Sequence, residues 1–396
     1  MNKVISFGCR LNHFEGKEIN HLISKKNDVV VINSCAVTNE AERRVRQAIR
    51  KAKKENPNKK IIVTGCGAQI NPDQFLKMNE VSSVVDNVNK LKKSTWENQD
   101  SSPSILNIFE DPQDELPSYD YDGMNVRENL VIQQGCNHRC TFCVIPYGRG
   151  NNRSFDPSYI IDQANKLVKK GVQEITLTGV DISDYGSDFK EHYCMSQLAL
   201  KILNKTKIKR LRLSSIDCVE LDPHFFDLLQ NSRLMPHLHL SLQSGDDLIL
   251  KRMKRRHLSK DIFKFIQKCK SVRPDITFGA DIIAGFPTET EKMFSNTCEL
   301  LKKCNITHLH IFPFSPKKNT PASKMPQLSK SVIKNRAKIL RKLGNDLMEK
   351  LEAAQSKPRK ILVEEKIMEH CIGYDQNYIK HQVPAFGIPI GEIITV

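Results

Sequence analysis

The chain has 396 residues, of which 39% are hydrophobic and 27% are charged, a balance that fits a globular protein and excludes a disordered or collagen-like one. Lysine and arginine interrupt every apolar run well before the roughly 18 residues that a membrane-spanning helix needs. The first twelve residues hold too few apolar side chains for the roughly 7 to 15 residues of a secretory signal core, so we expect a cytoplasmic protein with no membrane partner.

Lysine and arginine number 61 against 45 acidic residues, which gives a net charge of +16. This excess favours a polyanionic partner, because each contact of a cationic side chain with a phosphate releases counterions. A generally lysine-rich proteome would give the same excess, so charge alone leaves both readings open. The 12 cysteines indicate metal or redox chemistry more than disulfides, since a reducing cytosol keeps thiols free.

Residues 1–100 are predicted to form a small α/β domain. Its short apolar runs, which alternate with polar helices, are 3–7, 28–32, 60–63 and 82–85. One helix is predicted to follow the capping candidates Thr38 and Asn39 and to end before Pro57. The polar face of this helix is basic and fits either a solvated surface or one that contacts phosphates; its cations are Arg43, Arg44, Arg46, Arg50, Lys51, Lys53 and Lys54.

Residues 101–121 are predicted to form a linker or an extended arm. They are polar and acidic, lack periodicity and lie among Pro103, Pro112 and Pro117. A domain boundary near residue 120 follows.

Residues 122–353 are predicted to form a partial (βα)6 barrel of parallel strands. The stretches between the apolar runs are long enough for helices, as at 158–170 and 259–272, and a basic amphipathic helix is expected over 328–351. Six such units make an open barrel instead of the closed eight-stranded form. The six runs are 130–133, 174–178, 211–214, 238–242, 276–283 and 308–312.

Residues 354–396 return to short β-like runs and are predicted to form a small β module. The runs are 361–363, 377–380 and 392–396, and Gly373, Gly387 and Gly391 lie around them. The fold class is therefore α/β with a small C-terminal β-barrel-like module.

Three cysteines lie within eight residues, directly after the first strand of the predicted barrel: Cys136, Cys140 and Cys143. Three thiolates at this spacing can each hold one iron of a cubane cluster and leave the fourth iron open for a small chelating ligand. A structural zinc site would need a fourth ligand, for which only His138 is close in sequence. A position at the carboxyl end of a strand is where parallel α/β domains place their chemistry.

Three further cysteines each follow a strand of the first domain: Cys9, Cys35 and Cys66. If those strands are parallel neighbours, the three thiols emerge at one edge of the sheet and could hold a second open-sided cluster. Spacing alone also allows three unrelated loop cysteines. The remaining thiols share no spacing and are interpreted as buried or spare; they are Cys194, Cys218, Cys269, Cys298, Cys304 and Cys371.

Two pairs of histidines alternate on strands and so point to one face, where we interpret them as core or barrel-lumen residues. The pairs are His237 with His239 and His308 with His310.

The cysteine spacing resembles that of the radical S-adenosylmethionine enzymes, and Phe142 matches the aromatic residue that usually precedes the third cysteine. Over nearly the whole chain the motifs resemble the methylthiotransferases, and within them the enzymes that act on N6-threonylcarbamoyladenosine at position 37 of tRNA. The matching stretches are FGCRLN at 7–12, NSCAVT at 33–38, TGC at 64–66, QGCNHRCTFCVIPYGRG at 134–150, TGVD at 178–181, RLSS at 212–215, HLSLQSG at 239–245, IAGFPTET at 283–290 and FPFSP at 312–316.

The resemblance implies two 4Fe-4S clusters. One, on Cys136, Cys140 and Cys143, is expected to bind and reductively cleave S-adenosylmethionine, and an auxiliary one, on Cys9, Cys35 and Cys66, to deliver the methylated sulfur. Radical chemistry suits the substrate, since the C2 hydrogen of adenine is neither acidic nor a leaving group. A second S-adenosylmethionine would supply the methyl group. The expected partners are the tRNA anticodon loop, an electron donor of the reductase, flavodoxin or ferredoxin type, and a sulfur donor.

Phe142 and three further residues are carried over from the resemblance as cofactor contacts. Gly179 is expected beside the methionine amino group, and Ser215 and Gln243 near the ribose or amino-acid part, although all three could be ordinary strand-end residues. GYDQNYI at 373–379 resembles the RNA-binding TRAM module, where Tyr374 and Tyr378 could stack on RNA or simply pack. Gly67 stands where the family carries a bulkier residue.

Three alternatives stay open at this stage. A relative could methylthiolate isopentenyladenosine in tRNA, or a ribosomal protein side chain. A protein of another class would use its iron-sulfur clusters only to bind RNA or pass electrons, but the open iron position and the long βα repeat argue against this class.

Overall fold

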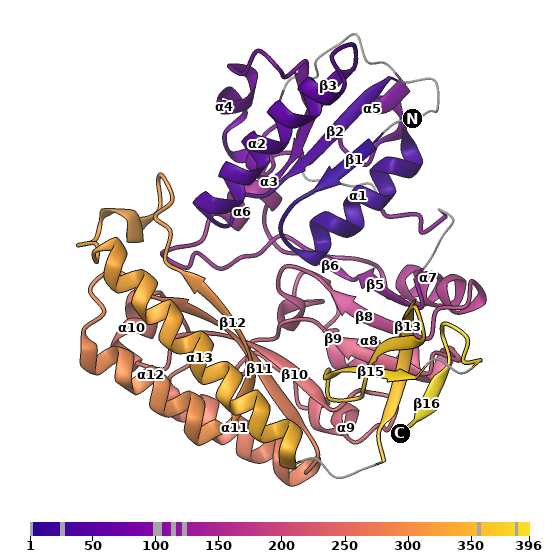
Figure 1. Ribbon diagram of the computed structural model, residues 1–396, viewed down its shortest axis with the longest axis vertical. Coiled ribbons are helices and arrows are strands. Elements are labelled where there is room, and N and C mark those ends of the chain that lie inside the picture. The colour runs from indigo at the N-terminus through magenta and orange to yellow at the C-terminus, as the bar shows by residue number, and fades with distance from the viewer. Residues whose placement is uncertain are drawn as a thin grey trace.

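The structure, a computed structural model, describes residues 3–23, 28–97, 105–111, 116–120, 125–354, 358–384 and 387–396. Three separate sheet regions follow one another along the chain, in the N-terminal part, the central barrel and the C-terminal tail (Figure 1). None of the helices in these ranges combines the length and the apolar character that crossing a bilayer requires.

The N-terminal part is a small α/β domain with strands at the four predicted apolar runs, and these strands form a parallel sheet in the order β1-β2-β3-β4. Ile19 of α1 packs on one face of the sheet and Val45 and Ile49 of α2 on the other. The strands are β1 (Lys3–Ser6), β2 (Val29–Ser34), β3 (Lys60–Gly65) and β4 (Ser83–Val84). The helices are α1 (Arg10–Leu22), α2 (Asn39–Glu55), α3 (Cys66–Ile70), α4 (Pro72–Leu76) and α5 (Lys93–Glu97).

Helix α2 begins where the sequence predicts. The Thr38 side chain caps it by accepting a hydrogen bond from the Ala41 backbone N–H, and Val45, Ile49 and Ala52 are the residues it buries. Its basic face is turned outward: Arg43 and Arg44 pair with Glu40 and Arg50 with Glu80, all in exposed or half-exposed positions. Such exposed pairs add little stability, so these cations remain available to a polyanion.

The segment between the first two domains packs against both of them and is not an extended arm over its described residues. The Leu106 backbone N–H donates to Asp86 Oδ2 (2.9 Å), and Ile108 is buried. Further on, Tyr119 is fully buried against the Phe14 ring (centroids 4.8 Å apart). Pro117 lies in this part, whereas Pro103 and Pro112 lie outside the described residues.

The central part is a six-stranded parallel open barrel with its strands in chain order. Two three-stranded sheets, β5-β8-β9 and β10-β11-β12, are joined by parallel bridges from Leu211 to Leu234 and from Ile216 to Leu240. The strands are β5 (Arg127–Val131), β8 (Glu174–Thr178), β9 (Arg210–Leu213), β10 (His237–Gln243), β11 (Thr277–Ala284) and β12 (Ile306–Pro313). All six predicted runs therefore coincide with strands.

Helices cover the outside of this barrel, and α13 packs along β12 (Figure 1). The predicted helices 158–170, 259–272 and 328–351 match α7, α11 and α13 within about three residues at each end. The helices are α6 (Ile145–Arg149), α7 (Pro157–Lys169), η1 (Ile182–Asp184), α8 (Met195–Lys205), α9 (Phe225–Leu229), α10 (Asp247–Arg252), α11 (Ser259–Val272), α12 (Glu291–Cys304), η2 (Pro321–Lys324) and α13 (Lys330–Ala354). A short antiparallel pair, β6 (Gln133–Gln134) with β7 (Arg153–Ser154), brackets the cysteine loop.

The C-terminal tail is a four-stranded antiparallel sheet in the order β15-β14-β13-β16. Its strands are β13 (Lys360–Ile367), β14 (His370–Tyr374), β15 (Lys380–Pro384) and β16 (Ile393–Thr395). The predicted strand over 377–380 is wrong, because residues 377–379 form a turn. Asp375 Oδ1 accepts from the backbone N–H groups of Asn377 and Ile379 (both 2.9 Å), which closes that turn before β15 begins.

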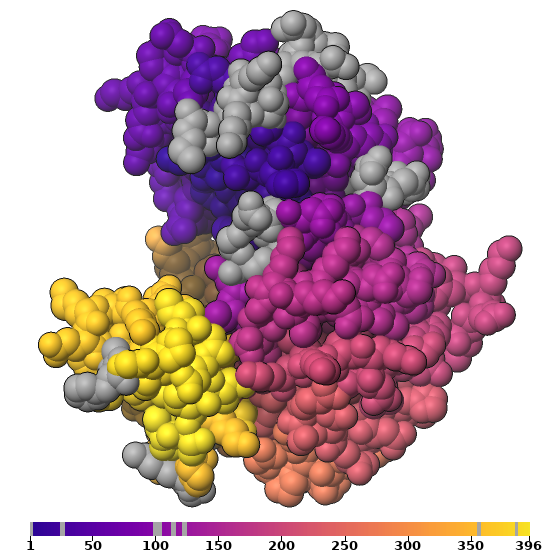
Figure 2. All heavy atoms as spheres, turned by 90° about the vertical axis from the view of Figure 1, so that its right-hand side faces the viewer, coloured from indigo at the N-terminus to yellow at the C-terminus, as the bar shows by residue number. Residues whose placement is uncertain are grey.

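The tail docks on the amino-terminal ends of the barrel strands, and Figure 2 shows it packed beside the barrel. Arg210 donates to the Lys360 carbonyl (2.6 Å) and Arg212 to the Asp375 carbonyl (2.7 Å). Tyr378 stacks on His237, with ring centroids 5.6 Å apart, and the Arg127 guanidinium lies over the Tyr374 ring at 4.8 Å. In this structure the two tyrosines therefore contact the barrel.

The buried phenol of Tyr119 ties the connecting segment to the barrel, because its oxygen accepts a hydrogen bond from the Val131 backbone N–H (2.7 Å). We expect Tyr119→Phe to lower the free energy of unfolding by about 1–3 kcal/mol, since it leaves a buried donor without its acceptor. Tyr147→Phe, at a half-exposed ring, is the control and should change stability by less than about 0.5 kcal/mol. Thermal and urea unfolding measure both, and equal stabilities for the two variants would contradict this role of Tyr119.

Candidate active site

The three cysteines of the first domain converge at the carboxyl edge of its sheet. Cys9 precedes α1, Cys35 follows β2 and Cys66 begins α3 directly after β3. Burial raises the pKa of the Cys35 thiol to about 12, and the nearby Cys66 and Cys9 raise it further. The sequence-based prediction that these thiols emerge together is therefore confirmed by their position.

The backbone around Cys35 is shaped to hold a thiolate. Gly8 has φ = +93°, and a Cβ there would lie 2.5 Å from Cys35 Sγ, so only glycine fits. The Val37 backbone N–H donates to Cys35 Sγ (3.4 Å). The absence of a side chain at Gly67 is explained by Ser34, because a Cβ at position 67 would lie 2.9 Å from Ser34 Oγ. Three thiols with an amide donor on sulfur are the donor set that an open-sided iron-sulfur cluster uses.

The second triad occupies the loop between β6 and α6. Backbone N–H groups again point at sulfur, from His138 to Cys136 Sγ and from Ile145 to Cys143 Sγ (both 3.4 Å), and Arg255 Nη1 lies 3.8 Å from Cys140 Sγ. Burial raises the pKa of the Cys143 thiol to about 12, so without a metal this thiol stays neutral. Iron would supply the positive charge that makes such thiols ionise, and the donor set fits a cluster.

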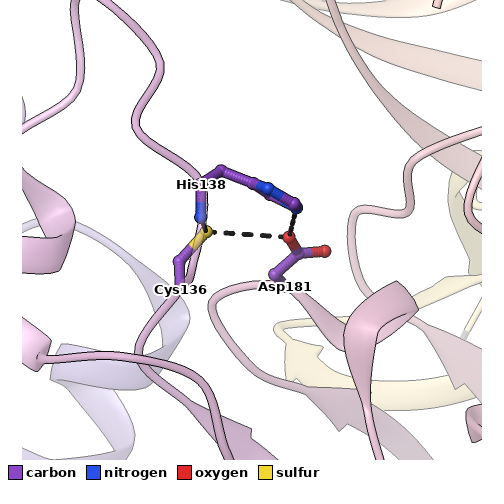
Figure 3. A group of neighbouring side chains, drawn as sticks. All are labelled: Cys136, His138 and Asp181. Atoms are coloured by element: carbon purple, nitrogen blue, oxygen red, sulfur yellow. Dashed lines mark hydrogen bonds and ion pairs between the residues drawn. The ribbon is translucent and has the colours of Figure 1, made fainter. Parts of the chain in front are cut away.

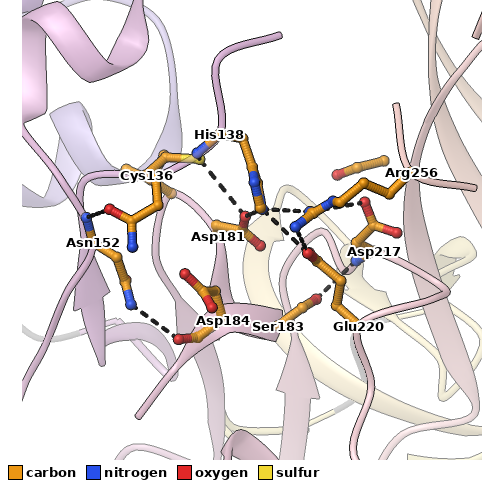
Figure 4. Close-up of polar contacts among 12 residues, drawn as sticks. Cys136, His138, Asn152, Asp181, Ser183, Asp184, Asp217, Glu220 and Arg256 are labelled. Atoms are coloured by element: carbon orange, nitrogen blue, oxygen red, sulfur yellow. Dashed lines mark hydrogen bonds and ion pairs between the residues drawn. The ribbon is translucent and has the colours of Figure 1, made fainter. Parts of the chain in front are cut away.

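A group of charged side chains lines the rim of this second triad (Figure 3). Asp181 Oδ2 lies 3.7 Å from Cys136 Sγ and 2.9 Å from His138 Nε2. His138 also lies 3.3 Å from Glu220 Oε1, and Arg256 contacts both His138 and Glu220 (Figure 4). Because the imidazole pairs with two carboxylates, the geometry gives no support to a zinc site that uses His138 with the three thiols.

A cavity of about 210 Å³ lies between the first domain and the barrel, beside residues that neighbour Cys35 and Cys143 in the chain. Residues from both domains line it, among them Val37 and Thr38 from the loop that follows Cys35 and Phe142 from the position before Cys143. Gln243, the last residue of β10, and Asp281, in the carboxyl half of β11, also line it. The cavity is therefore where a substrate could contact the chemistry of both triads.

The four predicted cofactor contacts fall into two places. Phe142 and Gln243 line the cavity, and Gln243 holds a positive φ of +71°, a strained conformation that is common at functional sites. Ser215 reaches the cavity indirectly, through a 3.4 Å contact with Asp281 Oδ2. Gly179 lies beside Gln133 instead: a Cβ at 179 would be 2.6 Å from Gln133 Oε1, the atom that accepts from the Val180 and Asp181 backbone N–H groups.

Helices α3 and α6 bring the two triads together. A Cβ on Gly148 would lie 3.2 Å from Cys66 Cβ, and the Gly148 carbonyl accepts from Asn87 Nδ2 (2.5 Å). Ala36, Cys66 and Val144 form one buried apolar cluster. Cys66 belongs to the first triad, Ala36 directly follows Cys35, and Val144 directly follows Cys143. The two triads therefore lie on either side of one domain contact.

A buried network of charges closes that contact. Arg149, at the end of α6, donates to Glu15 Oε1 and Oε2 (2.9 and 2.8 Å) and to Asn12 Oδ1 (2.6 Å), and Lys90 donates to Glu15 Oε2 (2.6 Å). Burial alone would raise the pKa of the Glu15 carboxyl, but the nearby cations of Arg149 and Lys90 hold this pKa at about 2. Although burial alone would lower the pKa of Arg149, the Glu15 carboxylate beside the guanidinium keeps it above its usual value.

Sequence reasoning missed several of these residues. Asp181 and Arg149 lie in stretches that it singled out but without an assigned role. The signal for Asp181 was a carboxylate shortly after a predicted strand, and that for Arg149 a cation shortly after Cys143. Glu15 and Lys90 gave no local signal, because their partners are distant in sequence. The six thiols interpreted as buried or spare are buried, except Cys298, which is half-buried.

Comparisons with known proteins place the chain among relatives of defined chemistry. Residues 130–301 match the model of the "Radical SAM superfamily" and residues 2–86 that of "Uncharacterized protein family UPF0004". The chain is 44% identical, over 99% of its length and 93% of the relative's, to "Threonylcarbamoyladenosine tRNA methylthiotransferase MtaB" of Rickettsia prowazekii. It is 30% identical, over 91% of its length and 81% of the relative's, to "tRNA-2-methylthio-N(6)-dimethylallyladenosine synthase" of Thermoanaerobacter sp..

Solved structures share the fold. The radical S-adenosylmethionine methyltransferase TsrM from Kitasatospora setae superposes with a TM-score of 0.55 at 13% identity, over 79% of this chain and 67% of that one.

The buried carboxylate of Glu15 is predicted to stabilise the contact between the two domains. We expect Glu15→Gln to lower the free energy of unfolding by about 3–5 kcal/mol, because it leaves Arg149 and Lys90 buried without a counter-charge. Glu55→Gln, at a half-exposed residue that pairs with the exposed Lys51, is the matched control and should be nearly neutral. Thermal unfolding and hydrogen exchange of α3 and α6 measure the effect. If the two variants unfold at the same temperature and protect these helices equally, the network does not carry the domain contact.

Proposed function

The chain belongs to the radical S-adenosylmethionine tRNA methylthiotransferases, and we propose that it converts N6-threonylcarbamoyladenosine at position 37 of tRNA into its 2-methylthio derivative. The observation that carries this proposal is that two cysteine triads, from two domains, flank one domain contact, beside a cavity that neighbours of both cysteine loops line. The relative from Rickettsia prowazekii, similar over nearly its full length, carries this activity in its name.

In this proposal, Cys136, Cys140 and Cys143 hold a 4Fe-4S cluster that binds S-adenosylmethionine, and Cys9, Cys35 and Cys66 hold an auxiliary 4Fe-4S cluster. When bound, the clusters supply reductive cleavage of S-adenosylmethionine to a carbon radical and the sulfur for transfer. The amide N–H groups of Val37, His138 and Ile145 stabilise the thiolates.

The chain's own residues bind and orient the reactants. Phe142 offers an apolar wall, packed edge-on against Phe286 (centroids 6.5 Å apart), beside which a cofactor or base can lie. Gln243 presents its amide at the cavity, and Ser215 holds Asp281 in place. The carboxylate of Asp181 is positioned 3.7 Å from Cys136 Sγ, where it can accept from an ammonium group of the methionine part, beside Gly179.

An adenine base has to leave its stack to enter the cavity, and a single-stranded anticodon loop allows this at a cost of a few kcal/mol. The net charge of +16 and the outward basic face of α2 support binding of RNA phosphates. An electron donor of the reductase, flavodoxin or ferredoxin type and a sulfur donor complete the proposed set of partners, and a cytoplasmic location follows from a tRNA substrate.

The proposed domain division keeps residues 1–100, 101–121, 122–353 and 354–396. It is supported by the three separate sheet regions and by the absence, among the described residues, of any strand that pairs across these bounds.

Variants in each triad test the two-cluster assignment. Anaerobically reconstituted protein should hold about eight irons as two cubanes, and Cys136→Ala should lose about four of them together with all cleavage of S-adenosylmethionine. Cys35→Ala is the matched variant: it should also lose about four irons but keep that cleavage and form no methylthio product. Iron analysis and quantification of 5′-deoxyadenosine measure both. A single tightly bound zinc in place of iron would reject the assignment.

Nucleoside mass spectrometry of tRNA from cells that lack this gene tests the substrate. We expect the methylthio form of threonylcarbamoyladenosine to disappear, its unmodified parent to accumulate, and methylthio-isopentenyladenosine to stay at its normal level. Restoring the wild-type gene should return the product, whereas the Cys136→Ala gene should not. Loss of the isopentenyl product instead would select the alternative substrate.

A further inference from the structure

Three groups of histidine, cysteine and aspartate in the described part of the chain come close enough to share an ion. Cys136, His138 and Asp181 belong to the site already described. In the second group, of Asp217, Cys218 and His257, the carboxylate is neutralised by Arg255 at 2.6 Å and all three side chains are buried. The third group, which we call the lumen triad, consists of His239, Asp281 and His310 and has no such cation paired with it in the described residues.

The register of β10, β11 and β12 brings the three side chains of the lumen triad together. His239 lies on β10 opposite Gly279 of β11, and Asp281, two residues further along, lies opposite His310 of β12. Residues two apart on a strand share a face, so the three side chains meet on the inner side of three neighbouring strands. A Cβ at Gly279 would lie 2.5 Å from His239 Nδ1, so the glycine makes room for this imidazole.

The donor atoms already stand at ligand spacing. His239 Nε2 lies 3.0 Å and His310 Nδ1 lies 3.3 Å from Asp281 Oδ1, and all three atoms fall within 4.8 Å of one another. Bonds of about 2.1 Å at octahedral or tetrahedral angles place neighbouring donors about 3.0–3.4 Å apart. Ser215 Oγ, 3.4 Å from Asp281 Oδ2, is placed as the outer hydrogen-bond partner that such a carboxylate usually has.

The lumen triad opens toward the cavity. Asp281 lines the cavity between the first domain and the barrel, and exposure rises from 13% for the His239 side chain to 60% for that of His310. Two imidazoles and one carboxylate occupy three positions of a metal and leave the others to water or substrate. An ion held here would therefore face whatever molecule enters the cavity.

We infer that His239, Asp281 and His310 bind a divalent transition-metal cation whose open positions receive the carboxylate of the substrate's threonyl group. The second half of this inference rests on the proposed function. A cation at this place favours an anionic substituent on adenosine, whereas an isopentenyl substituent offers no ligand to it. The lumen triad would then be a specificity site separate from both clusters.

Manganese binding tests the site without any need for turnover. In full-length protein with both clusters loaded and in their oxidised, diamagnetic state, titration followed by electron paramagnetic resonance should show one bound Mn²⁺ per chain. Asp281→Asn should weaken this binding by at least about tenfold, because it removes the anionic ligand. Iron content equal to that of the wild type shows that the variant is folded. Asp227→Asn is the matched control, because Asp227 pairs with His224 in an exposed position and belongs to none of the three groups found among the described residues.

Undiminished Mn²⁺ affinity in Asp281→Asn, or no stoichiometric site in the wild type, would overturn the inference and show that the lumen triad is only a hydrogen-bonded cluster. His310→Ala, at the most exposed ligand, gives an independent variant should Asp281→Asn fail to load iron.

The substrate ligand is tested with the nucleoside N6-threonylcarbamoyladenosine labelled with ¹³C in its carboxylate. Electron-nuclear double resonance at the bound Mn²⁺ should show a ¹³C coupling that unlabelled nucleoside lacks. Absence of this coupling at saturating nucleoside would remove the carboxylate from the inference. These results are independent of methylthiolation: failure of Mn²⁺ binding leaves the proposed function intact, and an unchanged tRNA in the deletion strain overturns the proposed function whatever Mn²⁺ does.

Discussion

The buried arginine-carboxylate-lysine network of Arg149, Glu15 and Lys90 is the constraint on which the geometry of the site depends. The side chains of Glu15 and Lys90 are 0% exposed and that of Arg149 is 3% exposed, so each charge is stable only while its partners stay in place. Because Arg149 ends the helix that follows Cys143, and Glu15 lies in the helix that follows Cys9, the network fixes one cysteine triad against the other. A buried ion network gives directional specificity that an apolar contact of the same area lacks.

A second polar contact joins the first domain to the barrel beside the cavity. Lys317, beyond β12, reaches Glu42 of α2 (2.8 Å), and the Asn39 backbone N–H donates to Ser315 Oγ (3.0 Å). Ser315 and Thr38 both line the cavity, and Thr38 caps the basic helix α2. An RNA loop bound along this helix would therefore approach the cavity from its N-terminal end.

Much of the fold could be predicted because its signals are local. Apolar runs separated by helical stretches indicated the strands and an α/β fold. The structure supplies the condition that the strands of the first domain are parallel neighbours, which places Cys9, Cys35 and Cys66 at one sheet edge. The charge network could not be predicted, since Glu15 is 75 residues from Lys90 and 134 from Arg149, and no pattern in the sequence joins them. In the tail, β14 was missed and 377–380 was assigned as a strand because Tyr378 and Ile379 have strand-like character, whereas Asp375 forces a turn there.

We propose that two iron-sulfur clusters lie on either side of the domain contact, beside one cavity. Electron paramagnetic resonance of the fully loaded, reduced protein tests this arrangement, because two paramagnets this close couple magnetically. We expect a spectrum that the sum of the spectra of the Cys136→Ala and Cys35→Ala variants does not reproduce, and that approaches this sum when Glu15→Gln loosens the contact. A wild-type spectrum equal to that sum would show instead that the clusters lie too far apart to act on one base.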